Sequence, residues 1–229
     1  MEQNQEKTNR EKKNRPIPPV VPVYLENTEN SVAWLFEMKA LEEHVSGKCM
    51  ENIVAETQDF SRLTFSGMRF TNCRFWECGF ERTEFTDVVF QGCDFSGCNF
   101  SDSYFNRVEF ISCKGVGTKF TGNRINDVWM KNCNMNYANF DNSVFKKLFV
   151  EETQLNSSNI SQCRCKAVSW KQAELTNASF FQTSMKSMDF TDSTITGLVL
   201  SDNFSELKGA VVDIYQAAEL AKRLGVVIR

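Results

Sequence analysis

The chain has 229 residues, of which 41% are apolar and 24% charged, so it is long enough to bury a core and is not wholly disordered. Its 26 basic and 29 acidic residues give a formal charge of −3, which by itself identifies no partner. A single histidine, His44, leaves few of the usual catalytic arrangements. No apolar run reaches the about 18 to 20 residues of a membrane span, and no signal peptide is recognisable, so we expect a cytoplasmic protein with reduced thiols.

The first part of the chain is polar and then rich in proline. Residues 1–15 contain five basic and three acidic residues and no apolar residue after Met1, which predicts a disordered tail. Residues 16–57 are expected to form an extended segment and an N-terminal cap. All four prolines of the chain begin this part, at Pro16, Pro18, Pro19 and Pro22. A short capping helix is predicted over residues 31–45, with an apolar stripe of Trp34, Leu35, Met38, Leu41 and Val45.

From Phe60 onward the sequence repeats every five residues. Extending this register to Leu200 gives 29 positions, and only Gly115 among them is not a large or medium apolar residue. A second column two residues earlier, from Leu63 to Leu198, is small or apolar except for Asn123. The candidate core ladder consists of Phe60, Phe65, Phe70, Phe75, Phe80, Phe85, Phe90, Phe95, Phe100, Phe105, Phe110, Phe120, Phe140 and Phe145.

A period of five matches neither the 3.6 of a helix nor the 2 of a strand, so the chain must turn in every repeat. A chain that turns in this way winds into stacked coils that bury the two columns on one another. Residues 58–203 are therefore predicted to form an all-β solenoid. Gly115 lacks the side chain that its column requires, and we expect a small backbone distortion of that corner, helped by Gly117.

The repeats resemble those of the pentapeptide-repeat family, as in Cys93-Asp94-Phe95-Ser96-Gly97 and Ala138-Asn139-Phe140-Asp141-Asn142. The resemblance covers about residues 58 to 202 without a change of register. It implies a right-handed quadrilateral β-helix with four pentapeptides per coil and about seven coils.

The cysteines are predicted to be structural. Seven of the nine occupy the inward column of small residues, at spacings that are multiples of five and unlike the CxxC pairs of zinc sites. Free cysteine packs as a small apolar residue, and the pair Cys163 and Cys165 also lies on inward columns. His44 is expected to be solvated. We therefore predict no metal, no cofactor and no enzymatic activity.

Residues 204–229 leave the repeat register and are predicted to form a dimerisation module. Asp213 and Gln216 resemble a capping box for a helix over residues 214–224 that covers the last coil with Ile214, Ala218 and Ala221. Residues 226–228 are expected to form a short strand that pairs with a second chain. The predicted interface consists of Ile214, Ala218, Val226, Val227 and Ile228.

The C-terminal residues resemble those of one group within this family. Leu207-Lys208-Gly209-Ala210-Val211 and Leu224-Gly225-Val226 are similar to the tail of the Qnr-type fluoroquinolone-resistance proteins, without the inserted loops of many members. The resemblance implies a tail-to-tail homodimer that binds DNA gyrase or topoisomerase IV as a mimic of DNA and protects the enzyme from fluoroquinolones. The alternative is a structural or adaptor solenoid with an unrelated protein partner.

Charge gives only local support to mimicry of DNA. Residues 59–202 carry 16 acidic and 15 basic residues, whereas duplex DNA of the expected length, roughly 34 Å, carries about 20 negative charges. With four repeats per coil, one face of the solenoid is basic. Direct binding of nucleic acid by this face is less favoured than binding of a protein partner. That face gathers Arg107, Arg124, Lys146, Lys147, Arg164, Lys166 and Lys186 against Glu84, Asp87 and Asp127.

Overall fold

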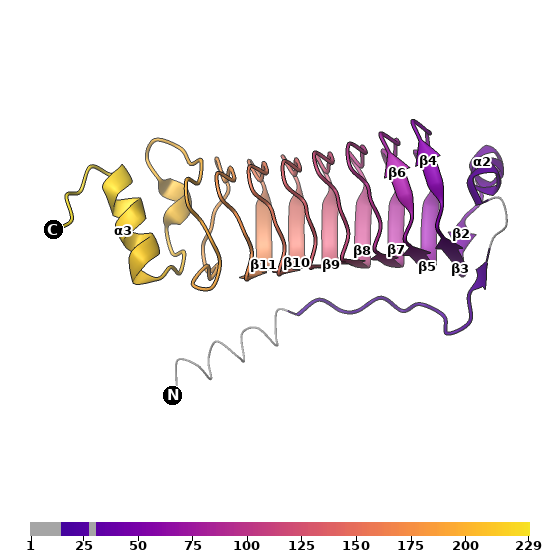
Figure 1. Ribbon diagram of the computed structural model, residues 1–229, viewed down its shortest axis with the longest axis horizontal. Helices are drawn as coiled ribbons and strands as arrows, with labels where there is room; N and C mark the ends of the chain where they lie inside the picture. Colours follow the sequence, from indigo (N-terminus) through magenta and orange to yellow (C-terminus); the bar gives the residue numbers. More distant parts are fainter. Residues whose placement is uncertain (1–14, 28–30) are drawn as a thin grey trace.

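The structure, a computed structural model, describes residues 15–27 and 31–229 and shows an elongated parallel β-solenoid (Figure 1). The tail expected at residues 1–15 lies outside the described residues except for Arg15. The predicted quadrilateral β-helix is confirmed, because equivalent residues of successive layers are 20 positions apart, the length of four pentapeptides.

One long sheet runs along the solenoid. Its strands pair in parallel in the order β1-β3-β5-β7-β8-β9-β10-β11, and β2 also pairs with β5. Six successive turns contribute an eight-residue strand each. The bounds are β1 Glu26–Asn27, β2 Val45–Ser46, β3 Lys48–Glu51, β5 Thr64–Thr71, β7 Glu84–Gln91, β8 Tyr104–Ile111, β9 Arg124–Lys131, β10 Val144–Glu151 and β11 Arg164–Lys171. A second sheet pairs β4 (Val54–Glu56) with β6 (Arg74–Trp76), and single bridges continue the two remaining faces.

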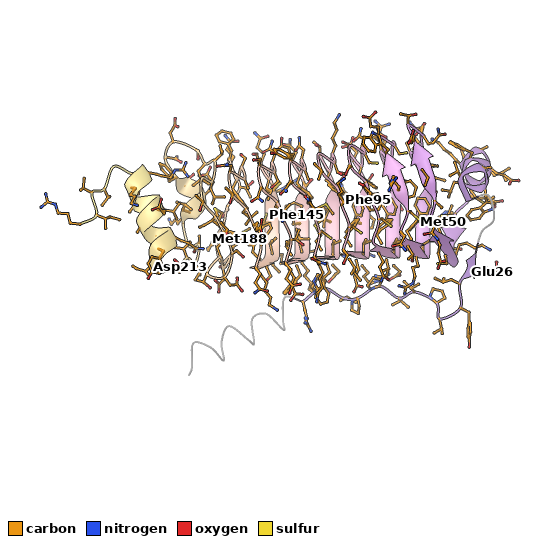
Figure 2. All side chains as sticks on the ribbon, viewed as in Figure 1. Glu26, Met50, Phe95, Phe145, Met188 and Asp213 are labelled. Carbon is orange, nitrogen blue, oxygen red and sulfur yellow. The ribbon has the colours of Figure 1, made fainter. Side chains whose placement is uncertain are left out.

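The phenylalanine ladder fills the interior. All fourteen of its members are buried, with no side chain more than 3% exposed. Rings of the same column stack between neighbouring layers, for example Phe80 on Phe100 at 4.7 Å and Phe100 on Phe120 at 5.2 Å between ring centroids. Figure 2 shows Phe95 and Phe145 at successive positions along the rod. The core is therefore continuous from the first layers to the last.

The inward column of small residues has a second role besides packing. Its hydroxyls and thiols donate hydrogen bonds to main-chain carbonyls of the preceding layer, as Ser103 Oγ does to Phe80 O at 2.8 Å and Cys98 Sγ does to Phe75 O at 3.0 Å. A small side chain with one donor therefore satisfies a buried carbonyl without disturbing the stack. All nine cysteines are free, and eight of them are buried.

The expected distortion at Gly115 is absent. The amide of Gly115 donates to Asn134 O at 2.8 Å, as the equivalent Phe95 amide does to Lys114 O. A Cβ atom placed on Gly115 would lie 2.6 Å from the sulfur of Met135. The flexible side chain of the next layer therefore takes the space that Gly115 leaves, and the coil keeps its regular shape.

The N-terminal cap is a helix, but it is shorter than predicted. Helix α2 covers Ser31–Ala40 and buries Leu35, and Glu42 ends the helical region with a left-handed φ of 55°. Val45, expected on the helix, instead begins the solenoid as part of β2. The proposed boundary at residue 58 is therefore wrong, since residues 45–57 already form a layer.

The C-terminal helix is confirmed. After the short 3₁₀ helix η1 (Ser205–Leu207), helix α3 spans Ile214–Arg223, and the predicted capping box of Asp213 with Gln216 is present. Two details differ from the expectation. Ile214 does not cover the last coil but is exposed, and residues 226–228 form no strand within this chain.

Candidate interaction surfaces

The described residues contain no recognisable catalytic or metal centre. His44 is exposed on the short link between α2 and β2. No group of three or more His, Cys, Asp or Glu side chains within the described residues could hold a metal ion. Burial raises the pKa of Cys163 to about 12, so this thiol stays protonated and is a poor nucleophile.

The C-terminal end exposes several apolar side chains before and after the body of α3, which together we call the tail surface: Ile214, Tyr215, Leu224, Val226, Val227 and Ile228. Ile214 is 76% exposed and Val227 is 80% exposed, and Val226 and Ile228 are half exposed. Four of the five predicted interface residues thus lie on this surface, whereas Ala218 is partly buried in α3. Exposed apolar side chains gathered at the end of the chain make this end a candidate interaction site.

The opposite side of α3 closes the solenoid. The Gln216 amide group donates to Phe190 O at 2.8 Å and to Ser193 O at 2.7 Å, and Arg223 donates to Leu198 O. Leu220 packs on the core from the same side of the helix. The last layer is therefore covered by α3, which leaves the tail surface free to meet another molecule.

Glu206 of η1 is a second closing residue, and it is almost completely buried. Its carboxylate accepts hydrogen bonds from the Gln182 amide at 2.8 Å, from the Ser201 amide at 3.2 Å and from the Ser201 hydroxyl. Burial alone raises the pKa of this carboxyl group, but these hydrogen bonds outweigh it and leave the pKa below its usual value.

The outward side of the eight-residue strands, which we call the sheet face, carries six of the seven basic residues predicted to gather there, whereas Lys186 lies in a later layer that has no strand. The registers place Lys146 beside Lys166 and Arg124 in line with Arg164 across β9, β10 and β11. Near β7 to β10 the charges alternate instead. Arg107 forms a bidentate pair with Asp87, both distances being 2.6 Å, and Lys147 lies 3.5 Å from Asp127.

Residues 15–25, which we call the strap, lie along the sheet face (Figure 1). The main-chain amides of Val20 and Ile17 donate to Asp87 Oδ1 and Asp127 Oδ1, each at 2.9 Å. The strap therefore covers part of the basic face that the sequence alone presents as open.

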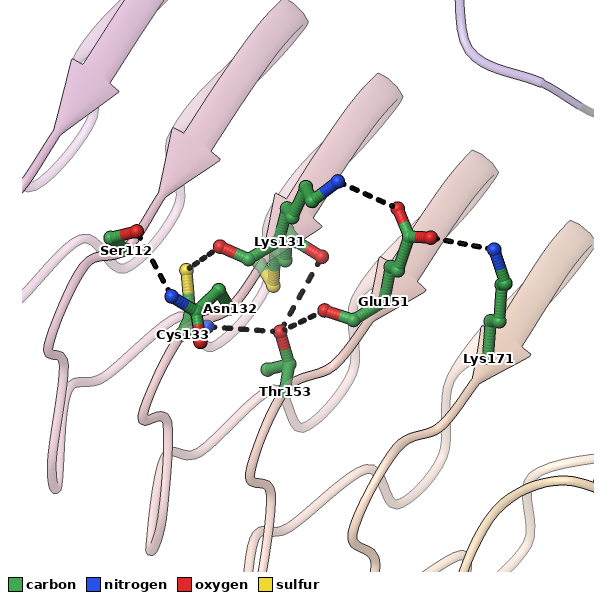
Figure 3. Close-up of polar contacts among 8 residues, drawn as sticks. Ser112, Lys131, Asn132, Cys133, Glu151, Thr153 and Lys171 are labelled. Carbon is green, nitrogen blue, oxygen red and sulfur yellow. Dashed lines mark hydrogen bonds and ion pairs between the residues drawn. The ribbon is translucent and has the colours of Figure 1, made fainter.

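A shallow polar groove follows the adjacent corner, lined by side chains from Ser112 to Glu174 and about 700 Å³ in volume. Above it Glu151 lies between Lys131 at 3.6 Å and Lys171 at 2.7 Å (Figure 3). Thr153 Oγ1 accepts from the Cys133 amide at 3.2 Å and donates to Glu151 O at 2.8 Å. The polar groups drawn here are largely occupied with one another, so the corner is better explained as layer-to-layer bonding than as a ligand site.

A comparison with family models matches the chain to the pentapeptide repeat region over residues 63–140 and 103–169. The chain is a pentapeptide-repeat protein. No curated protein sequence matches the chain.

Among solved structures, this pentapeptide-repeat protein is similar to QnrB1, a plasmid-mediated fluoroquinolone resistance protein. One trypsin-treated variant of QnrB1 is 25% identical, with a TM-score of 0.52 over 80% of this chain and 92% of the QnrB1 chain. HetL, which is involved in regulating heterocyst differentiation in the cyanobacterium Nostoc sp. strain PCC 7120, is 14% identical, with a TM-score of 0.51 over 78% of this chain and 95% of HetL. The HetL likeness concerns the fold alone. Within the described residues, no helix of the pentapeptide-repeat protein is long and apolar enough to cross a membrane.

Sequence reasoning located the tail surface and the basic face of this pentapeptide-repeat protein but missed two features. Glu206 looks like an ordinary polar residue after the last repeat. The sequence predicts only that the strap is extended, and no local signal links it to Asp87 and Asp127. The one available clue was the proline spacing, because Pro16, Pro19 and Pro22 recur every three residues.

Proposed function

We propose that this pentapeptide-repeat protein is a non-catalytic interaction protein of the cytoplasm that binds DNA gyrase or topoisomerase IV and protects or modulates the enzyme. The observation that carries the proposal is the likeness to QnrB1, which is 25% identical over 80% of the chain. The exposed tail surface supports it, because it provides the C-terminal contact on which the proposed dimer depends.

The proposed assembly is a homodimer joined through the tail surface. Residues 226–228 follow Gly225, which has a left-handed φ of 81°. The Val226 amide bonds Ala221 O at 3.2 Å, whereas the amides of Val227 and Ile228 form no hydrogen bond within the described residues and lie beside exposed Val and Ile side chains. Pairing with the same segment of a second chain under two-fold symmetry buries the apolar side chains and satisfies the backbone groups of both chains. Because α3 already covers the last layer, such pairing stops at two chains.

We expect the full-length protein to have twice the 26.3 kDa mass of one chain in light scattering. Val227→Asp places a charge in the apolar contact and is expected to yield a monomer, because burying two unpaired carboxylates is strongly unfavourable. Tyr137→Asp, at an exposed position in the middle of the solenoid, is the matched control and should remain dimeric. A monomeric wild-type protein, or a dimeric Val227→Asp variant, contradicts the assembly.

Binding in place of DNA is proposed to depend on shape and on local charge. The acidic and basic residues of the solenoid nearly cancel, so total charge cannot reproduce the about 20 negative charges of a duplex of similar length. A long rod made by two solenoids still has the form of a duplex segment. Exposed acidic side chains that form no ion pair in the described residues, such as Glu77 and Asp102, are the ones available to meet a DNA-binding surface.

A supercoiling assay tests the proposed function. Added protein is expected to restore gyrase supercoiling in the presence of a fluoroquinolone, and the Val227→Asp variant is expected to restore less because it lacks the dimer. The Tyr137→Asp variant should act like the wild type. If neither gyrase nor topoisomerase IV responds to the dimeric wild-type protein, with or without drug, the proposal is wrong.

The second candidate is an adaptor solenoid with an unrelated protein partner. The observation that favours it is the near-neutral solenoid, which lacks the strongly negative surface expected of a general mimic of DNA. Binding to another protein at higher affinity than to either topoisomerase would support this alternative.

A further inference from the structure

The strap crosses the sheet face in a regular way. Glu26–Asn27 pairs with β3, Pro22 lies over Gly67 of β5, and Val20 and Ile17 bond Asp87 of β7 and Asp127 of β9. At the far end the Arg15 guanidinium lies 5.2 Å from the centre of the Trp129 ring, which is cation–π distance. The strap and the following Glu26–Asn27 therefore contact the rod at five points from β3 to β9.

The backbone of the strap is restricted to extended polyproline-II geometry. Proline fixes its own φ near −65° and disfavours helical geometry in the residue before it. Between residues 15 and 22, every residue except Val20 either is proline or precedes one. The described residues 15–22 accordingly form no helix or strand, and their main chain is free to bond the solenoid.

The repeat of such a segment matches the repeat of the solenoid. Ile17 and Val20 are three residues apart, which spans about 9.3 Å in a polyproline-II helix at about 3.1 Å per residue. Asp127 and Asp87 are 40 residues apart, which is two layers, or about 9.6 Å at the usual strand spacing of about 4.8 Å. One amide per turn of the strap therefore meets one carboxylate in every second layer.

The alternation of charge on the sheet face provides this spacing. The same left-handed bend recurs in each layer, and its occupants from β7 to β10 are Asp87, Arg107, Asp127 and Lys147, with φ between 52° and 58°. Arg107 and Lys147 pair with the aspartates and hold them in place for the strap. With the strap in place both aspartate side chains are largely buried, so their hydrogen bonds to the strap are shielded from water.

We propose that the sheet face over β5 to β9 is a binding site for polyproline-II segments and that the strap is its built-in ligand. The recognised segment has a proline at every third position, a residue with a free amide directly after each of those prolines, and an arginine at its N-terminal end for Trp129. A segment of this chemistry from another chain binds only by displacing the strap. This site is independent of the tail surface and of the proposed topoisomerase binding.

Hydrogen exchange in the full-length protein tests the attachment of the strap. The amides of Ile17 and Val20 are expected to be protected in the wild type, and Asp127→Ala and Asp87→Ala are each expected to remove protection from their own partner. Alanine is tolerated in this bend, since Ala167 occupies it with a φ of 57°. Ser187→Ala, in the same bend of a layer that the strap does not reach, is the control. Unprotected wild-type amides, or protection that persists in both aspartate variants, would overturn the proposal.

Binding of a synthetic peptide of residues 15–24 tests recognition from another chain. In a full-length variant, Pro16→Gly, Pro19→Gly and Pro22→Gly together weaken the built-in ligand. This variant should bind the peptide at least tenfold more tightly than the wild type does, because the wild-type strap competes at an effective concentration of about millimolar. Methylating the peptide nitrogens of Ile17 and Val20 should abolish binding, whereas methylating that of Val21, which makes no hydrogen bond in the described residues, should not. Equal affinity for wild type and variant, equal loss with either methylation, or no binding to the variant at millimolar peptide contradicts the proposed site.

Discussion

Phe100→Ala is expected to lower the free energy of unfolding by about 3 to 5 kcal/mol, the usual loss when a large buried aromatic side chain is removed. Phe100 is fully buried and lies between Phe80 and Phe120, with ring centroids 4.7 and 5.2 Å away. The surrounding layers are bonded to one another and cannot close over the missing ring. Chemical denaturation followed by circular dichroism measures the loss.

The neighbouring Ser101→Ala variant is the control. Ser101 is partly exposed, and its hydroxyl bonds only the side chain of Asn99, at 2.6 Å. We expect a change within about 0.5 kcal/mol, as for most surface substitutions. Similar losses in both variants would contradict the arrangement of two inward and three outward positions per repeat.

Glu206→Ala is expected to destabilise the C-terminal end by about 2 to 4 kcal/mol. The substitution leaves the amides of Gln182 and Ser201 and the Ser201 hydroxyl without their common acceptor. The effect should be local, so hydrogen exchange should rise near Gln182 and Ser201 before it rises in β5 to β9. Uniform destabilisation of the whole rod, or none, contradicts the closing role of Glu206.

Glu206→Gln separates the charge of this group from its shape, because the amide oxygen can still accept hydrogen bonds. The folded-state pKa of Glu206 is lowered, so the stability that its charge contributes is present above the unfolded pKa of about 4.3 and is lost as the pH falls through the lower folded value. The wild type should therefore be more stable than Glu206→Gln at neutral pH, and the difference should shrink below about pH 4. A difference that is independent of pH contradicts the role of the charge.

The repeat made the solenoid predictable, because each pentapeptide places its inward residues by the same rule whatever the rest of the chain does. The prediction from the repeat failed where the inward positions lack phenylalanine. The first layer has Val45, Met50 and Ala55 at the inward positions, and without phenylalanine these residues did not stand out, although all three are buried. At Gly115 the repeat predicts a distortion that does not occur. The side chain of Met135 fills the space that Gly115 leaves, and the sequence pattern does not reveal this contact.

The surfaces were harder to predict because they depend on contacts between residues far apart in the sequence. The amide of Ile17 meets Asp127 across 110 positions, and this match follows from the layer spacing and not from any local motif. Similarly, Glu206 becomes a closing residue only once the amides of Gln182 and Ser201 are brought to the end of the rod. The tail surface was partly predictable, since the apolar segment after the final glycine has no evident strand partner in the sequence.

Binding of the full-length protein, the proposed dimer, to purified gyrase, measured with and without linear duplex DNA, is the decisive measurement for the proposed function. We expect saturable binding that decreases as duplex DNA occupies the enzyme, and weaker binding by the Val227→Asp variant. Topoisomerase IV is measured in parallel as the second predicted partner. Absence of binding to both enzymes, or binding that duplex DNA leaves unchanged, would contradict the claim that the rod takes the place of DNA.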